Sequence, residues 1–277
     1  SHGKTFSICL AVSNDGGNTF IKYKGNPVIS NYAEGNRDPK VFWHKETQRW
    51  VMVIYLINNV FAIYSSSNLI NWRYESEITL PPLIEMPNLF PIPGTQFWAL
   101  LAGANFWGDG AVANYYTGTF DGEKFTPKNG PYPIDFGKDF YSLQTVSNAP
   151  EDKIILIGWR TRHLAEKEKY NMPFNGEFSI PCEICAVEID GELRLGRFPV
   201  RDFIDYPAKK SCNYKYKQSK EGFELFNFLS DSYSAEIEFE AGNNSLTEFS
   251  LGGTKFHYNA EKEIFNCFGK DIKIPLI

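Results

Sequence analysis

Residues 36–43 read Asn-Arg-Asp-Pro-Lys-Val-Phe-Trp, and a similar arrangement follows at residues 84–90, Ile-Glu-Met-Pro-Asn-Leu-Phe. In both stretches a carboxylate, Asp38 or Glu85, stands just before an apolar, aromatic run that is typical of a β-strand. Two acids at the same point of repeated units predict one shared pocket for acid/base work on a polar substrate. Each motif could also have a purely structural role. Asp38 could form a local ion pair with Arg37 in a turn, and Glu85 could be a surface acid at the end of a strand.

The rest of the chain favours repeated β-units. Short runs rich in β-branched and aromatic residues alternate with turns of Gly, Asn, Asp and Pro, and helical periodicity is almost absent. A first hairpin is expected between residues 8–12 and 19–23. Three four-strand units are then expected, with strands at 40–43, 50–55, 60–65 and 72–76; at 89–92, 97–101, 112–119 and 124–125; and at 142–147, 153–159, 176–181 and 184–189.

Repeats of roughly 40–50 residues, each with four short strands, are the sequence mark of a β-propeller. The pattern fades over residues 193–206. Further alternations at 222–226, 235–239, 247–251, 255–258 and 264–268 resemble a β-sandwich. We therefore predict an all-β chain with a partial propeller over residues 1–203 and part of a sandwich over residues 204–277.

Composition narrows the class of partner. The chain has 277 residues, 16% of them aromatic, and a net charge of −5. Amphipathic rings are common stacking surfaces for sugars, whereas phosphate binding needs a cationic face. We expect a carbohydrate substrate and no nucleic acid. No apolar stretch approaches the length of a membrane span, so no membrane partner is expected.

Cysteine and histidine usage predicts no metal and no cofactor. The five cysteines are odd in number and irregularly spaced, which does not indicate a disulfide framework. Cys182 and Cys185 form a Cys-x-x-Cys pair, but they lie in a strand-like run, where residues three apart face opposite sides. No second Cys or His pair lies nearby in the sequence to complete a zinc site.

Several ordered stretches resemble glycoside hydrolase family 32. They are Leu10-Ala-Val-Ser-Asn-Asp-Gly-Gly-Asn-Thr-Phe, Asn26-Pro-Val-Ile, Arg37-Asp-Pro-Lys-Val-Phe-Trp, Glu85-Met-Pro-Asn-Leu-Phe, Tyr115-Tyr-Thr-Gly-Thr-Phe-Asp-Gly, Phe140-Tyr-Ser-Leu-Gln-Thr and Gly158-Trp159. This family comprises the invertases, inulinases and levanases, which act on β-fructofuranosides. The resemblance implies a five-bladed propeller, a retaining mechanism, and release of fructose from levan, inulin or sucrose. It favours a secreted or cell-surface location.

The resemblance also implies roles for individual residues. Glu85 would be the acid/base, and Asp38 would hold sugar hydroxyls and stabilise the transition state. Arg37 would lie alongside Asp38 as a substrate-binding residue. Tyr141 and Gln144 are further candidates for substrate binding, as is His163, which stands where the family motif has an aromatic residue.

Local surroundings suggest how the two acids would differ. Glu85 has apolar neighbours in sequence, which should raise its pKa, whereas Arg37 can pair with Asp38 and keep it ionised. Such a split between two carboxyls suits glycoside cleavage.

One family motif is absent. The family's nucleophile is an Asp in an Asn-Asp-Pro-Asn motif, and no stretch of these 277 residues matches it. We therefore expect the first blade and the nucleophile to be missing, the C-terminal sandwich to be cut short, and the isolated chain to be inactive. Two other readings stay open: a non-catalytic carbohydrate-binding propeller, and a related five-bladed arabinosidase or xylosidase.

Overall fold

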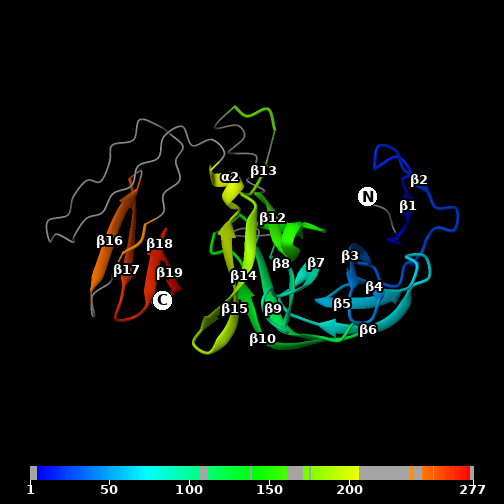
Figure 1. The fold of residues 1–277 in the computed structure, drawn as a ribbon, viewed down its shortest axis with the longest axis horizontal. Helices are drawn as coiled ribbons and strands as arrows, with labels where there is room; N and C mark the ends of the chain where they lie inside the picture. Colours follow the sequence, from blue (N-terminus) through cyan, green and yellow to red (C-terminus); the bar gives the residue numbers. More distant parts are fainter. Residues whose placement is uncertain are drawn as a thin grey trace. The chain divides into compact units, whose positions relative to one another are not determined.

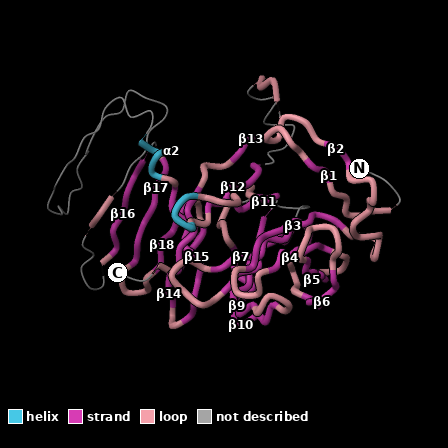
Figure 2. The backbone as a smooth tube through the Cα atoms, turned by 45° about the vertical axis from the view of Figure 1, so that its right-hand side comes forward, coloured by secondary structure: helices cyan, strands magenta, loops and turns pink. Residues whose placement is uncertain are grey.

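A computed structural model describes residues 5–105, 112–137, 139–160, 171–174, 176–205, 237–239, 245–251 and 253–274. Strands make up nearly all of its regular structure (Figure 2). The chain divides into two compact units, Ser1–Phe198 and Pro199–Ile277. None of the helices among the described residues is long and apolar enough to cross a membrane.

The first unit contains the three predicted four-strand repeats, each as an antiparallel sheet whose strands follow chain order (Figure 1). The first sheet is β3 (Arg37–His44), β4 (Arg49–Tyr55), β5 (Val60–Ser66) and β6 (Arg73–Thr79). The second is β7 (Ile84–Pro91), β8 (Trp98–Asn105), β9 (Val112–Phe120) and β10 (Phe125–Pro133). The third is β11 (Tyr141–Thr145), β12 (Ile155–Arg160), β14 (Cys182–Ile189) and β15 (Glu192–Pro199), with β13 (Glu177–Phe178) beside β12.

The central strands of the first two sheets, such as β4, are apolar on both faces because buried clusters cover them on both sides. In β4, Val51 and Val53 face one buried cluster, while Met52 and Ile54 face another. Successive side chains of a strand point to opposite faces. This explains why residues 50–55 read as a continuous apolar run rather than as an alternation.

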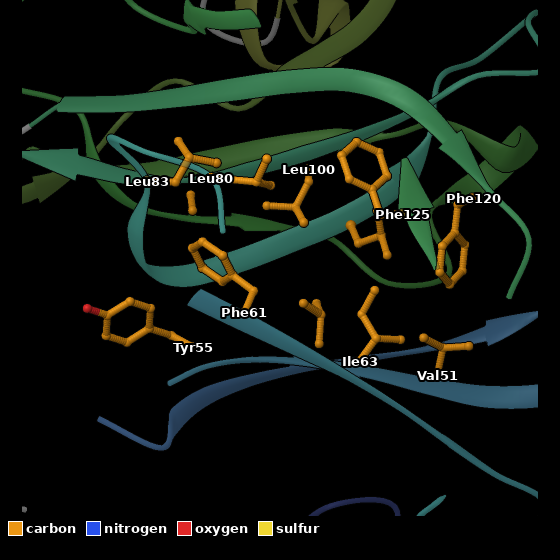
Figure 3. Packing of buried hydrophobic residues seen from close by; sticks show 12 residues of the cluster. Val51, Tyr55, Phe61, Ile63, Leu80, Leu83, Leu100, Phe120 and Phe125 are labelled. Atoms are coloured by element: carbon orange, nitrogen blue, oxygen red, sulfur yellow. The ribbon is translucent and has the colours of Figure 1, made fainter. Parts of the chain in front are cut away.

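A shared core joins the first sheet to the second. Figure 3 shows Val51, Phe61 and Ile63 of the first sheet facing Leu100 and Phe125 of the second. Each of these side chains is at most 1% exposed. A second cluster joins the other face of β8 and β9 to the third sheet. The innermost strands β3, β7 and β11 are thereby brought together, with β7 in contact with both of the others.

The third sheet corrects one prediction. The expected strand at residues 176–181 is only the two-residue β13, and the third and fourth strands are β14 and β15, so the sheet extends into the stretch where the pattern was expected to fade. The turn Asp190-Gly191 joins them, with φ values of 54° and 75°. Such a positive-φ pair is the usual two-residue hairpin connection.

Short elements complete the first unit. The predicted N-terminal hairpin is confirmed, since β1 (Ala11–Val12) pairs with β2 (Ile21–Lys22). Before β12 the chain makes a single turn of 3-10 helix, η1 (Pro150–Asp152).

The second unit begins with the short helix α2 (Arg201–Asp205) and contains one four-stranded antiparallel sheet. Its strands are β16 (Leu246–Leu251), β17 (Thr254–Asn259), β18 (Ile264–Cys267) and β19 (Lys270–Lys273). The sequence predicted the first three but not β19. The strand expected at 222–226 lies outside the described residues, and residues 237–239 do not form a strand.

Candidate active site

Each innermost strand is interrupted by a β-bulge close to its start. In β3 the pairing with β4 runs from Arg37 opposite Tyr55 directly to Lys40 opposite Val53. The same kind of register shift occurs in β7 between Ile84 and Asn88, and in β11 between Tyr141 and Gln144. A bulge bends a strand and redirects the side chains that it carries.

The bulged residues adopt a backbone conformation that is unusual for residues with side chains. The φ angles are 58° for Asp38, 47° for Glu85, 49° for Met86 and 50° for Ser142. None of them is glycine, and this region costs free energy for residues that carry a Cβ. The equivalent bulges therefore place both predicted acids off the regular alternation of their strands.

The predicted residues Arg37, Asp38, Glu85 and Tyr141 form one hydrogen-bonded cluster, which we call the Glu85 cluster. Arg37 Nη2 donates to Glu85 Oε1 at 2.6 Å, and the Tyr141 hydroxyl donates to Glu85 Oε2 at 2.7 Å. The Met86 amide donates to Asp38 Oδ2 at 3.1 Å. The two carboxylates and their partners thus come from the innermost strands of all three sheets.

The cluster is partly open to solvent. The side chains of Arg37, Asp38 and Glu85 are about 30%, 30% and 29% exposed. Tyr141, in contrast, is only 2% exposed, and the Arg37 guanidinium carbon lies 4.7 Å from the centre of the Tyr55 ring. A solute can therefore reach the carboxylates while their partners are held by packing.

The charge arrangement differs from the expectation. Arg37 makes its short contact with Glu85, and its Nε is 3.7 Å from Asp38 Oδ2. Burial raises the pKa of Asp38, which the Met86 amide and Arg37 oppose only in part. Burial and the neighbouring Glu85 carboxylate raise the pKa of the Tyr141 phenol, so this group stays a proton donor. Arg37 thus pairs with Asp38, as the sequence suggested, but makes its shorter contact with Glu85, which the sequence did not suggest.

A glycine makes room for Tyr141. A Cβ on Gly103 of β8 would lie 2.7 Å from Tyr141 Cε2 and 2.8 Å from its hydroxyl oxygen. Only a residue without a side chain allows the ring to approach the strand this closely. An isolated glycine inside a predicted strand is a sequence signal for such an approach, and it was not used.

The remaining candidates have different outcomes. Gln144 is exposed on β11, beyond the bulge. His163 lies outside the described residues. Sequence reasoning missed Tyr55, Met86 and Ser142, whose hydroxyl lies 2.7 Å from Met86 Sδ.

The described residues also form a cavity outside the cluster. This cavity, of about 450 Å³, is lined by Ile29, Ser30, Asn31, Tyr32, Tyr64, Tyr74 and Glu77, and it includes no residue of the Glu85 cluster. Among the described residues, no group of three or more His, Cys, Asp or Glu side chains could hold a metal ion. The chemistry of the carboxylates, rather than the size of a cavity, therefore identifies the candidate site.

Comparison with known proteins decides the family. The model of the glycosyl hydrolases family 32 N-terminal domain matches residues 2–195, which include all three sheets except the end of β15. This chain belongs to glycoside hydrolase family 32. All four residues of the Glu85 cluster lie within the range that the family 32 model matches.

Curated relatives agree with this assignment. A levanase from Bacillus subtilis (strain 168) is 31% identical over 265 residues, an alignment that covers 87% of this chain and 38% of the levanase. An extracellular exo-inulinase from Meyerozyma guilliermondii is 38% identical over 166 residues, covering 54% of this chain and 32% of the inulinase. This chain thus spans less than half the length of each of these relatives.

Solved structures confirm the predicted fold class, an incomplete five-bladed propeller followed by part of a sandwich. The exo-inulinase from Aspergillus awamori superposes with a TM-score of 0.60 at 28% identity, over 71% of this chain and 44% of that one. The β-fructofuranosidase from Schwanniomyces occidentalis gives 0.71 at 24% identity, over 95% and 57%. The second likeness concerns the fold alone.

Proposed function

We propose that this family 32 chain carries part of the active site of a hydrolase that releases fructose from β-fructofuranosides such as levan, inulin or sucrose. The observation that carries the proposal is the Glu85 carboxylate, bonded through one oxygen to Arg37 and through the other to Tyr141, beside Asp38. Relatives named levanase and exo-inulinase support this class of substrate.

Glu85 is the general acid/base in this proposal. Its carboxyl protonates the glycosidic oxygen as the bond breaks and then activates the attacking water. The hydrogen bonds from Arg37 and Tyr141 fix the direction of the carboxyl group, so less entropy is lost when a sugar binds.

Asp38 acts on the sugar itself. A carboxylate accepts hydrogen bonds from two sugar hydroxyls, and its negative charge stabilises an oxocarbenium-like transition state. Met86 fixes Asp38 through its backbone amide, which leaves the other carboxylate oxygen for the substrate. Arg37, Tyr141, Gln144 and His163 are proposed to contact the substrate.

The mechanism is proposed to be retaining, through a covalent fructosyl-enzyme formed on an Asp nucleophile. The Asn-Asp-Pro-Asn motif that carries this residue in the family is not among the 277 residues. Loss of one member of a catalytic group costs roughly four powers of ten in rate. We therefore propose that the chain alone binds fructosides but does not hydrolyse them. A secreted or cell-surface location is proposed as well, and one relative is named as extracellular.

The test compares fructose release by this chain alone with release by the same chain joined to an N-terminal segment that carries the Asn-Asp-Pro-Asn motif. Levan, inulin and sucrose are the substrates. We expect release only from the joined protein, and a loss of about a thousandfold or more in its Glu85→Gln variant.

A matched control is Glu123→Gln, because the Glu123 side chain is 59% exposed and lies in the turn between β9 and β10. This variant should keep full activity. A joined, folded protein that releases fructose from none of the three substrates would overturn the proposal. Binding without release would instead favour a non-catalytic carbohydrate-binding propeller.

A further inference from the structure

In the part of the chain that the structure describes, no neighbouring strand pairs with the backbone groups at the inner edge of β11. β11 is the first strand in the order β11-β12-β14-β15 of the third sheet, so only its other edge is paired. Unpaired N–H and C=O groups in a buried position must find other partners. Leu143 and Thr145 are buried at this edge, with 2% and 8% exposure.

The side chain of Asn88 pairs with this edge as a peptide group would. Its Nδ2 donates to Leu143 O at 2.8 Å, and its Oδ1 accepts from Thr145 N at 3.0 Å and from Thr145 Oγ1 at 3.2 Å. Nδ2 also lies 3.2 Å from Met86 O. Asn88 is 0% exposed, so these bonds are made away from water. One amide from β7 thus joins the second sheet to the third.

Lys40 closes the same edge from β3. Its Nζ donates to Thr145 O at 2.6 Å. Burial lowers the pKa of Lys40, and within the described part of the chain no carboxylate lies within ion-pair distance of its ammonium group. Lys40 is half-buried, and a lysine that loses hydration without gaining an ion pair costs free energy unless it finds another acceptor. The bond to Thr145 is the interaction that accounts for its position.

Lys40, Asn88 and Thr145 lie at or just after the ends of the three β-bulges. Regular pairing resumes at Lys40 in β3, at Asn88 in β7, and at Gln144, followed by Thr145, in β11. We propose that Asn88 and Lys40 are positioning residues, which lock the three innermost strands at Thr145 and so hold Tyr141 and Arg37 against Glu85. We call this group the Thr145 clasp.

The clasp acts on the site through the backbone. Tyr141 reaches Glu85 from the start of β11, and a slip of β11 against β7 by about 1 Å would stretch its 2.7 Å hydrogen bond beyond hydrogen-bonding distance. Asn88 and Lys40 both hydrogen-bond the backbone at the inner edge of β11, so removing Asn88 weakens the hold on this strand and allows this movement. Only the expected effect of the Thr145 clasp on sugar binding rests on the proposed function.

The test has one readout that needs no ligand. A 3-fluorotyrosine is placed at Tyr141, and its ¹⁹F chemical shift reports the hydrogen bond to Glu85. The Glu85→Gln variant supplies the shift of an altered bond. We expect Asn88→Ala to move the wild-type shift toward that value, and Lys40→Met to move it in the same direction, whereas Lys40→Arg, which keeps a cationic donor, stays nearer to the wild type.

The second readout is the affinity for a short inulin oligosaccharide, measured by calorimetry. We expect at least a tenfold loss in Asn88→Ala. The matched control is Ser65→Ala, because Ser65 is 1% exposed and hydrogen-bonds Glu75 at the opposite end of the first sheet. This control should lower the melting temperature while leaving the ¹⁹F shift and the affinity unchanged.

The outcomes separate the two proposals. An Asn88→Ala protein that is folded, melts earlier and keeps the wild-type ¹⁹F shift would overturn the positioning role. If Asn88→Ala does not fold, Lys40→Met against Lys40→Arg decides the same question. If the wild-type chain binds no oligosaccharide, the proposed function fails, while the ¹⁹F shift still decides for or against the clasp.

Discussion

Replacing Gly103 with alanine should separate Tyr141 from Glu85. The new Cβ would lie 2.7 Å from Tyr141 Cε2, whereas carbon atoms in contact are about 3.5–4.0 Å apart. The ring must therefore retreat by about 1 Å. That movement stretches the 2.7 Å bond between the Tyr141 hydroxyl and Glu85 to a distance at which no hydrogen bond remains.

The expected cost has two parts. Overpacking of this kind costs about 1–3 kcal/mol of unfolding free energy. For a unit of this size each kcal/mol corresponds to about 2–4 °C in melting temperature, so we expect a fall of roughly 2–12 °C. Affinity for a fructo-oligosaccharide should fall by about tenfold or more, because loss of a hydrogen bond to a charged group costs about 1.5–3 kcal/mol.

The assay is a thermal melt followed by circular dichroism, together with calorimetric binding. Gly196→Ala is the matched control, because its Cβ would lie 2.7 Å from Cys185 Sγ in the outer strands of the third sheet. This control should lose stability but not affinity. A double-mutant cycle with Tyr141→Leu tests the cause. If Gly103→Ala lowers stability and affinity as much in the Tyr141→Leu background as in the wild type, a clash with the Tyr141 ring is not the cause.

Three further predictions concern charge and backbone conformation. Burial raises the pKa of Asp38, so this group makes the folded protein less stable as pH rises through that pKa. Asp38→Asn should therefore be more stable than wild type near pH 7 in urea melts, and this gain should fade toward pH 4. A gain that does not depend on pH would contradict this cause. Arg37→Met should lower oligosaccharide affinity by about tenfold or more in calorimetry. It should change the unfolding free energy by about 1 kcal/mol or less, because the pair between Arg37 and Glu85 is partly exposed. An unchanged affinity would show that Arg37 does not belong to the site. Gly191→Ala should lower the unfolding free energy by about 1–2 kcal/mol in chemical denaturation, because φ at this residue is 75°. The new Cβ would have no atom within 4 Å, so oligosaccharide affinity should not change. No loss of stability would mean that the turn changes conformation easily.

The sequence predicted the sheets well because their physical cause is local. Residues 50–55 form a continuous apolar run between turns, which is typical of a strand buried on both faces. The equivalent positions of Asp38 and Glu85 could also be predicted, since each stands next to the apolar run of the first strand in its unit, although both prove to lie inside that strand. Asp190-Gly191 was an available hairpin signal whose omission misplaced the strands of the third sheet.

The detailed contacts of the site could not be predicted in the same way. Alternation along a strand assigns side chains to faces, and a bulge breaks that alternation by inserting a residue. The bulges at Asp38 and Glu85 contain no glycine, so composition does not reveal them. As a result, the sequence suggested Arg37 for its neighbour Asp38, whereas the structure gives its short bond to Glu85.

The bulges also determine which changes of sequence can abolish or create such a site. Deleting Pro39 would restore one-to-one pairing in β3 and turn the residues before it to the opposite side of the sheet, although every chemical group of the site would still be present. Substitutions alone on an uninterrupted strand cannot reproduce this arrangement. Ancestral or engineered blades would therefore gain or lose this chemistry through insertions and deletions of one codon in β3 or β11 and of two in β7. Sequence comparisons that ignore gaps at these three points would overlook such changes.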